Sequence, residues 1–342
     1  MADLGEFGLI DRLARTLQGD ATDPLRPSSR GEIRIGDDAA LWQPTPGASE
    51  VLTTDALVED VHFRLRTTSW QDLGWKALAQ NVSDVAAMGA KPRRAFITLG
   101  LRGDTPVADL EALYGGMGEL AEQYGVAIVG GDTVASPVIL ISVSVVGELT
   151  GDGLRRSAGR EGDLLAVTGA LGGSRAGLEI LEAGGPAPDD PDALALATVH
   201  RRPIPRVAEG LVLTAAGVPC GMDLSDGLLG DAGKLAYASG LAATLRWDAL
   251  PLHPVLARRS GEDGRATALV GGEDFELLVA GPNEAIERAA TTLARGGLAP
   301  LTVVGALHRG PSGQVRVVDA DGTPRSTPGT SWDHFASREG GT

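Results

Sequence analysis

The sequence predicts an α/β protein of two domains. Segments with the periodicity of strands alternate with segments typical of helices along the chain. The length of 342 residues is enough for two domains with sizeable cores. Residues 150–162 are rich in glycine and charge and have little apolar periodicity, so we place the boundary there. The predicted domains are therefore residues 1–150 and 151–342.

The first domain is predicted to alternate strands and helices from its beginning. Ser69 is the expected N-cap of a helix, because Asp72 follows three residues later, and Gly89 is expected to end this helix. Gly125 is expected to stop the next helix. In chain order the expected elements are strand 51–54, helix 73–88, strand 95–101, helix 107–124, and strands 126–129 and 138–149.

The second domain is predicted to continue the same alternation. Pro205 is expected to occupy the first position of a helix, and Asp321-Gly322 to turn a hairpin. Residues 184–192 are expected to form a loop. In chain order the expected elements are strand 164–168, helix 174–183, helix 205–216, a short strand ending at Met222, helix 228–239, strands 242–247 and 275–280, helix 284–295 and strand 301–304.

Charge and cysteine content exclude several classes of protein. Acidic residues exceed basic ones by 45 to 30, which argues against nucleic acid or an anionic membrane as a partner. The longest apolar stretch, residues 138–146, is far shorter than a membrane span, and the N-terminus lacks the pattern of a signal peptide. The single cysteine, Cys220, is expected to be a small buried thiol, which fits a cytoplasmic location.

Aspartates recur beside Gly, Ser or Thr at the ends of the expected elements. Any one such aspartate is most simply a turn former or an N-cap. Six clusters spread over both domains favour a shared purpose. Carboxylates on separate loops suit Mg2+, and glycine lets the backbone approach phosphate oxygens closely. The pattern therefore indicates a site for a Mg2+-bound polyphosphate. The clusters are GDD at 36–38, TTD at 53–55, NVSD at 81–84, GGDT at 130–133, DLSDG at 223–227 and GGED at 271–274.

The common signatures of other phosphate-binding enzymes are absent. The sequence contains no Walker A motif, no GxGxxG motif after a strand and no protein-kinase motif set. No histidine lies near Ser225 in sequence, and His62 reads equally well as a structural or a functional residue. A transfer between two phosphates needs no strong base, because a phosphate oxygen is already an anionic nucleophile. The other histidines are expected to be surface or turn residues; they are His200, His253, His308 and His334.

The motifs resemble those of the thiamine-monophosphate kinases, within the superfamily that includes aminoimidazole ribonucleotide synthetase. The resemblance covers nearly the whole chain, from GEFGLI at residues 5–10 to WDHF at 332–335. Each motif alone is weak, but the ordered set is specific. The intermediate matches are IGDDAAL, TTDALVEDVHF, WKALAQNVSDVAAMGAKP, GGDT, TGALGGSRAGL, HRRPIPR, DLSDGLLGDAG and GGEDFEL.

The resemblance implies ATP-dependent phosphorylation of thiamine monophosphate to thiamine diphosphate. It further implies several Mg2+ ions, direct in-line transfer without a phosphoenzyme, and the two-domain fold of this superfamily, each domain a mixed sheet packed with helices. The N-terminal domain would bind ATP and metal and form a homodimer through its sheet. The C-terminal domain would complete the active-site cleft.

Site residues are implied by the same motifs. Asp84, Asp223 and Asp226 are expected to be catalytic. The ATP contacts are expected to be Gly131, Asp132, Arg156, Ser225 and Tyr114, with Arg155 beside Arg156 as the alternative guanidinium. The thiamine-phosphate contacts are expected to be His62, Glu273 and Trp332, although Trp332 also reads as an anchor of the C-terminus. The implied Mg2+ ligands are Asp38, Thr53, Thr54, Asp55, Asp84, Asp132, Asp223 and Asp226.

One departure and three rival functions accompany this interpretation. Gly173 stands where the family usually has an acidic residue, so that role does not carry over. Selenophosphate synthesis expects a reactive N-terminal Cys with a nearby Lys, and residues 1–35 contain neither; aminoimidazole ribonucleotide synthesis is the other rival within the superfamily. A non-catalytic Ca2+- or nucleotide-binding protein is the alternative from another class. The presence of both ATP-side and thiamine-side motifs argues against it.

Overall fold

The computed structural model describes residues 5–18, 34–35 and 39–327, and the chain forms two compact units. The first unit comprises residues 1–154, 181–186 and 201–217. The second comprises residues 155–180, 187–200 and 218–342. The chain therefore leaves the first unit and returns to it before completing the second.

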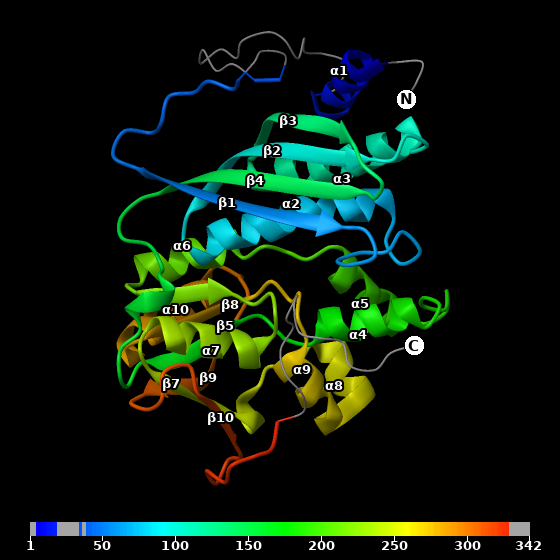
Figure 1. Ribbon diagram of the computed structural model, residues 1–342. Helices are drawn as coiled ribbons and strands as arrows, with labels where there is room; N and C mark the ends of the chain where they lie inside the picture. Colours follow the sequence, from blue (N-terminus) through cyan, green and yellow to red (C-terminus); the bar gives the residue numbers. More distant parts are fainter. Residues whose placement is uncertain (1–4, 19–33, 36–38, 328–342) are drawn as a thin grey trace. The chain divides into compact units, whose positions relative to one another are not determined.

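The first unit contains a four-stranded mixed sheet, with strand order β1-β4-β2-β3 (Figure 1). Strand β4 is antiparallel to both of its neighbours, whereas β2 and β3 are parallel. The strands are β1 (Ser49–Val58), β2 (Lys91–Leu101), β3 (Ala127–Ala135) and β4 (Leu140–Leu149).

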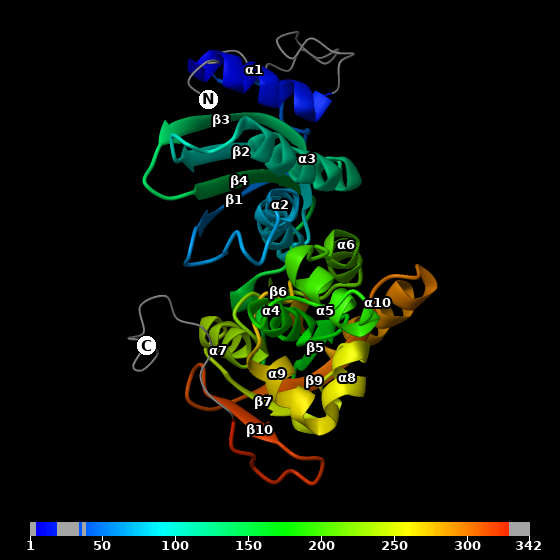
Figure 2. The same cartoon turned by 90° about the vertical axis from the view of Figure 1, so that its right-hand side faces the viewer.

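Helices α2 (Trp70–Ala87) and α3 (Val107–Tyr124) cover one face of this sheet (Figure 2). Ser69 caps α2 by accepting the Asp72 N–H, and Gly125 ends α3 in the left-handed conformation, as expected. The two helices approach closely: a Cβ atom on Gly74 would lie 1.8 Å from the Leu113 carbonyl oxygen. Helix α1 (Gly5–Gln18) packs against α3.

The returning segment, residues 201–217, is held on α2 and α3. Trp75 Nε1 donates to the Pro203 carbonyl at 2.8 Å, and the Tyr124 hydroxyl donates to the Pro205 carbonyl at 3.0 Å. The Arg202 guanidinium pairs with Asp72 and Glu119 and lies over the Trp75 ring. The HRRPIPR motif therefore brings α6 (Val207–Ala215) onto α2.

The second unit contains a six-stranded mixed sheet, with strand order β10-β7-β9-β5-β8-β6. Only the β10–β7 pair is parallel. The strands are β5 (Leu164–Thr168), β6 (Cys220–Asp223), β7 (Ala242–Arg246), β8 (Leu277–Gly281), β9 (Leu301–His308) and β10 (Val315–Val318). The α-helices are α4 (Gly173–Glu182), α5 (Pro191–Arg201), α7 (Leu228–Ala238), α8 (Pro254–Ser260), α9 (Gly264–Val270) and α10 (Asn283–Arg295).

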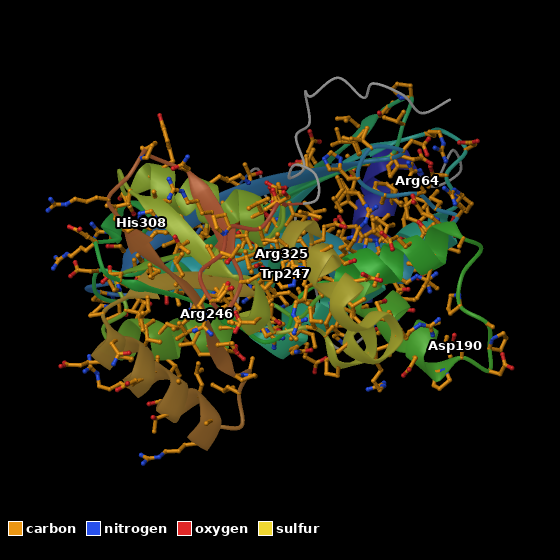
Figure 3. The ribbon with its side chains drawn as sticks, turned by 90° about the horizontal axis from the view of Figure 1, so that it is seen from below. Arg64, Asp190, Arg246, Trp247, His308 and Arg325 are labelled. Atoms are coloured by element: carbon orange, nitrogen blue, oxygen red, sulfur yellow. The ribbon has the colours of Figure 1, made fainter. Side chains whose placement is uncertain are left out.

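The end of the described chain is tied to the second unit. Asp319 N–H donates to the Thr323 carbonyl, and Arg325 N–H donates to Val317, so the expected turn at Asp321-Gly322 is confirmed. The Arg325 guanidinium lies 4.3 Å from the centre of the Trp247 ring in the 3₁₀-helix η2 (Trp247–Ala249). Both residues are labelled in Figure 3.

The predicted α/β class with mixed sheets is confirmed, and most elements lie where the patterns place them. Four helices were not predicted: α1, α5, and the short helices α8 and α9. Strand β3 also runs on through the GGDT motif, which was expected to be a loop. Within the described residues, no helix is both long and apolar enough to cross a membrane.

Candidate active site

The strongest contact among the predicted residues of the first unit joins Thr53 and Asp84. Thr53 lies on β1 and Asp84 on the last turn of α2, and the Thr53 hydroxyl donates to Asp84 Oδ2 at 2.5 Å. Both residues are partly exposed. Two motifs separated by about thirty residues thus place their oxygen atoms together.

The TTD motif is divided between the two faces of the sheet. Side chains alternate along a strand, so Asp55 shares the face of Thr53, toward α2, while Thr54 lies on the opposite face. Thr54 Oγ1 accordingly donates to the Val143 carbonyl and accepts from Ser144 Oγ. Only the backbone of Thr54 could join a ligand set built around Asp84.

Gly131 and Asp132 lie on the edge strand β3. Asp132 pairs in register with Thr98, which belongs to the same face as Thr54. Its exposed carboxylate accepts the N–H of Thr133 at 2.8 Å. Asp132 is thus separated from Asp55 by three strand spacings, about 14 Å, and by the plane of the sheet. A Cβ atom on Gly131 would lie 1.9 Å from the Ile97 carbonyl oxygen, so the strand pairing itself requires glycine there.

His62 and Tyr114 have local structural contacts. His62 follows the turn after β1, and its Nδ1 accepts the N–H of Val58 at 3.1 Å. Tyr114 lies in the hydrophobic core of the first unit, where burial raises the pKa of its hydroxyl.

Two motifs of the second unit form one site because β6 pairs with β8. DLSDG begins at the end of β6, and GGEDFEL leads directly into β8. The Glu273 N–H donates to the Ser225 carbonyl at 2.8 Å, and the Phe275 N–H donates to the Leu224 carbonyl at 2.9 Å. Asp223 is buried at the strand end. The predicted residues Asp223, Ser225, Asp226 and Glu273 therefore lie in adjacent loops.

Asp226 is held by Lys234, a lysine in the middle of α7. Lys234 Nζ donates to Asp226 and, at 2.8 Å, to the fully buried Asp231 carboxylate. Asp231 also accepts the Asp226 N–H. The two carboxylates hold the pKa of Lys234 above its ordinary value despite its desolvation. The Asp226 side chain thus remains 30% exposed while Lys234 balances part of its charge.

The loop around Glu273 is strained. Glu273 and Phe275 have φ values of 66° and 51°, in the left-handed region that residues other than glycine rarely adopt. Asp274, between them, accepts the N–H groups of Gly172 and Ser174 at the start of α4. Such strain persists where the surrounding contacts over-determine it, which is common at functional sites.

Asp274 predicts a pH dependence of stability. Burial, with the negative charges of Glu276 and Glu273, raises the pKa of Asp274 to about 7. Because the pKa of Asp274 is higher in the folded protein than in the unfolded chain, protonation of Asp274 stabilises the fold. This stabilisation is complete below about pH 3.8 and is lost as pH rises toward 7. Between pH 5 and pH 8 we expect a loss of about 3 kcal/mol in the free energy of unfolding. Urea denaturation of the wild type and of Asp274→Asn at several pH values measures this loss. If the difference in the free energy of unfolding between the two proteins stayed constant with pH, the raised pKa of Asp274 would be contradicted.

Arg156 lies apart from the DLSDG loop. Its carbonyl accepts from Ser239 Oγ, beyond the C-terminal end of α7, whereas Asp226 precedes the N-terminal end. The 11 residues of α7 span about 16 Å. The Arg155 and Arg156 side chains are both exposed, so the geometry does not choose between them. Cys220 is buried as expected, and desolvation raises its pKa to about 11.

The remaining predicted positions need separate mention. Asp38 and Trp332 lie outside the described residues. At Gly173, a Cβ atom would meet the His253 ring at 3.1 Å, so this ring occupies space that an acidic side chain would need. Among residues 5–18, 34–35 and 39–327, no three His, Cys, Asp or Glu side chains gather closely enough to hold a metal ion.

Comparisons with known proteins decide the family. The model for the AIR synthase related protein, N-terminal domain, matches residues 36–149, and that for the C-terminal domain matches residues 160–318. The chain is 34% identical to the thiamine-monophosphate kinase of Bacillus subtilis over 97% of its own length and 100% of the relative's. The chain belongs to the thiamine-monophosphate kinase family. The resemblance drawn from the motifs, and the enzyme class it implied, are confirmed.

Solved structures of thiamine-monophosphate kinases share the whole fold. That of the Stenotrophomonas maltophilia enzyme superposes with a TM-score of 0.79 at 38% identity, covering 94% of this chain and 98% of the other. AaThiL, complexed with AMPPCP and TMP, superposes with a TM-score of 0.75 at 35% identity over 98% of both chains.

One histidine that was not predicted as a site residue lies beside the predicted residue Glu273. The expectation that His200 is a surface or turn residue is wrong: it is 5% exposed, with its Nδ1 3.0 Å from Ser174 Oγ and 3.6 Å from Glu273 Oε2. The signal that could have found it is its place at the head of HRRPIPR, one of the ordered motifs. A histidine on an unpredicted helix, α5, gave no other indication of burial.

Proposed function

We propose that this chain transfers the γ-phosphoryl group of ATP to the phosphate of thiamine monophosphate, giving thiamine diphosphate and ADP. The observation that carries the proposal is the similarity over 98% of both chains to AaThiL, whose structure contains AMPPCP and TMP. AMPPCP is an analogue of ATP, and we take TMP there to be thiamine monophosphate. The acidic, glycine-rich motifs of both units support the same activity.

Direct in-line transfer fits the residues available. The acceptor phosphate is itself the nucleophile, so the reaction depends on positioning and charge stabilisation rather than on a base. Cys220 is unsuited to covalent catalysis, because its buried thiol has a pKa of about 11. We therefore propose a reaction without a phosphoenzyme intermediate.

Mg2+ is the proposed metal, and the donor chemistry suits it. Asp84 and Thr53 supply carboxylate and hydroxyl oxygens 2.5 Å apart, and Asp55 shares their face of the sheet. One turn before Asp84, the buried Asn81 Oδ1 accepts no hydrogen bond from any residue that the structure describes. When bound, Mg2+ would neutralise charge on the polyphosphate and on the transferred group. We also propose Asp38, Asp223 and Asp226 as ligands, and Thr54 through its backbone. Asp132 lies on the other face of the sheet, so we propose that it binds a separate ion.

The remaining roles divide between nucleotide and thiamine. We propose that Gly131, Arg156 and Ser225 contact ATP, with Tyr114 near the nucleotide. For thiamine phosphate we propose His62, Glu273 and Trp332. The carboxylate of Glu273 would attract the cationic thiazolium, and a tryptophan ring stacked on that cation would contribute about 0.5–2 kcal/mol. In this account residues 1–150 bind ATP and metal and dimerise, and residues 151–342 complete the site.

A homodimer through the first unit's sheet is also proposed. Helices α2 and α3 cover one face of this sheet, and the other face carries Thr54, Ser144, Leu52 and Val134. Leu52 is 71% exposed and Val134 is 48% exposed. Large apolar side chains this exposed on a sheet face are typical of a surface that a partner covers. A second copy of the chain is the occupant that we propose.

Leu52→Glu is expected to produce a monomer. A glutamate on the apolar face would lose its hydration on dimerisation without gaining a partner charge. Sedimentation velocity should give the mass of two chains for the wild type and of one chain for the variant, with unchanged circular dichroism. Leu194→Glu, at a 43% exposed leucine on α5, is the matched control and should leave the dimer intact. A wild type that sediments as one chain would refute the dimer.

The assay of substrate identity tests the proposed activity. The protein is incubated with MgATP and either thiamine monophosphate or an aminoimidazole ribonucleotide precursor, and products are separated chromatographically. We expect thiamine diphosphate and ADP in the first reaction and no conversion in the second. Conversion of the precursor alone would overturn the proposal in favour of the rival activity in this superfamily. We retain a cytoplasmic location, and the absence of a nucleic-acid partner, as predictions from composition.

A further inference from the structure

A buried polar pair lies beside the carboxylate of Glu273. His200 ends α5 and is 5% exposed, and Ser174, in the first turn of α4, is fully buried. His200 Nδ1 lies 3.0 Å from Ser174 Oγ and 3.6 Å from Glu273 Oε2. One imidazole nitrogen thus faces both the serine hydroxyl and the carboxylate. The proposed activity gives neither His200 nor Ser174 a role.

The backbone of the Glu273 loop is fixed by other contacts. Glu273 and Phe275 donate their N–H groups to the DLSDG loop, and Asp274 accepts two N–H groups at the start of α4. Glu276 in turn accepts the Thr168 hydroxyl at 2.7 Å. These contacts involve the backbone of the loop, in which φ of Glu273 is 66°. The Glu273 carboxylate is 29% exposed and lies 3.6 Å from His200 Nδ1.

The packing of α4 on α5 includes His200 and extends beyond it. A Cβ atom on Gly177 of α4 would lie 2.1 Å from the Leu196 carbonyl oxygen of α5 and 3.1 Å from the His200 Cβ atom, so the helices are in close contact there. Leu196 and Ala176 belong to a small apolar cluster with Val255 and Leu256. Burying a polar pair beside such packing costs desolvation, which the hydrogen bond between His200 and Ser174 offsets.

We propose that His200, held by Ser174, is a positioning residue that orients the Glu273 carboxylate toward the cationic part of the thiamine substrate. This inference rests on the proposed function. The partly exposed carboxylate of Glu273 suits a cationic ligand. A carboxylate restricted to one orientation loses less conformational freedom when the ligand binds, so binding is tighter. The effect should therefore fall on thiamine phosphate and not on ATP.

Steady-state kinetics of His200 variants provide the test. His200→Leu should raise KM for thiamine monophosphate about 10-fold, because the Glu273 side chain would then be ordered only when the substrate binds. KM for ATP should change less than about 2-fold. His200→Asn, which keeps a polar group near the Nδ1 position, should recover most of the loss. Ser174→Ala should also raise KM for thiamine monophosphate, but by less than His200→Leu does. His308→Asn, at a histidine of the same unit bonded to Thr244 and labelled in Figure 3, is the control and should change neither KM.

A double-mutant cycle with Glu273→Gln separates positioning from general stability. If His200 acts through Glu273, His200→Leu should raise KM no further in the Glu273→Gln background. The inference would be overturned if the effects of His200→Leu and Glu273→Gln on KM were additive. It would also be overturned if His200→Leu raised KM for ATP as much as KM for thiamine monophosphate, or raised neither. If His200→Leu does not fold, Ser174→Ala replaces it in the cycle with Glu273→Gln, and the same comparison of KM values tests the inference.

Calorimetric titration with thiamine monophosphate distinguishes this inference from the proposed function. We expect Kd to rise about 10-fold in His200→Leu relative to the wild type. If the wild type bound thiamine monophosphate but formed no thiamine diphosphate, the proposed kinase activity would be refuted. The role of His200 would then still be tested by the ratio of Kd values between His200→Leu and the wild type. A wild type that does not bind it would overturn both.

Discussion

Asp84→Asn is expected to lower kcat by on the order of 10³-fold at saturating Mg2+ and ATP, because it removes a charge from the proposed metal site. The substitution keeps the shape of the side chain, and the Thr53 hydroxyl can still donate to the amide oxygen. Folding should therefore survive. Turnover is measured by formation of thiamine diphosphate, and folding by thermal unfolding.

Asp104→Asn is the matched control for Asp84. Asp104 is an exposed aspartate of the same unit, and its ion pair with Arg102 is long, at 3.7 Å. We expect the activity of this variant to match the wild type, because exposed ion pairs contribute little. An Asp84→Asn protein with more than about a tenth of wild-type turnover would contradict its role as a ligand, since loss of a charged ligand costs far more than this.

Asp226→Asn is expected to lower kcat on the order of 10²–10³-fold and to raise the Mg2+ concentration needed for half-maximal rate. In the structure Lys234 balances part of the Asp226 charge, and the neutral variant leaves that lysine with Asp231 alone. The fold should be retained, because Asp231 still accepts the N–H of residue 226.

Asp248→Asn is the control for this prediction. Asp248 is exposed in the same unit and pairs with Arg246, a residue labelled in Figure 3. Its replacement should leave both kcat and the Mg2+ requirement unchanged. A normal Mg2+ requirement in Asp226→Asn would remove this aspartate from the proposed ligand set, even if kcat falls.

Local patterns predicted the elements whose signals are local. Ser69 with Asp72 identified the start of α2, and Gly125 identified the end of α3. The ordered motifs identified the family, because each short match constrains the next. Helices α8 and α9, of 7 residues each, are too short to show a full amphipathic period and were missed.

Contacts between residues far apart in the sequence determined the features that local sequence patterns did not predict. The return of residues 201–217 to the first unit depends on Arg202 and Trp75, which lie far apart in the sequence. The GGDT motif reads as a turn but pairs as an edge strand, because β2 supplies its hydrogen bonds. Likewise, strand alternation separates the side chains of Thr53 and Thr54 although their residues are adjacent.

The grouping of DLSDG with GGEDFEL was equally inaccessible from sequence. It follows from the antiparallel pairing of β6 with β8, whose partners are more than fifty residues apart. His200 enters the same region only because α5 packs beside α4. Burial of such a residue depends on the tertiary arrangement and not on its own periodicity.

Transfer of the γ-phosphate label from ATP tests the central claim most directly. The wild-type protein is incubated with Mg2+, thiamine monophosphate and ATP labelled at the γ-phosphorus, and the label is followed through every product. The account predicts that the label appears in the terminal phosphate of thiamine diphosphate, one label for each ADP formed. Label recovered only as inorganic phosphate, or ADP formed without thiamine diphosphate, would contradict it.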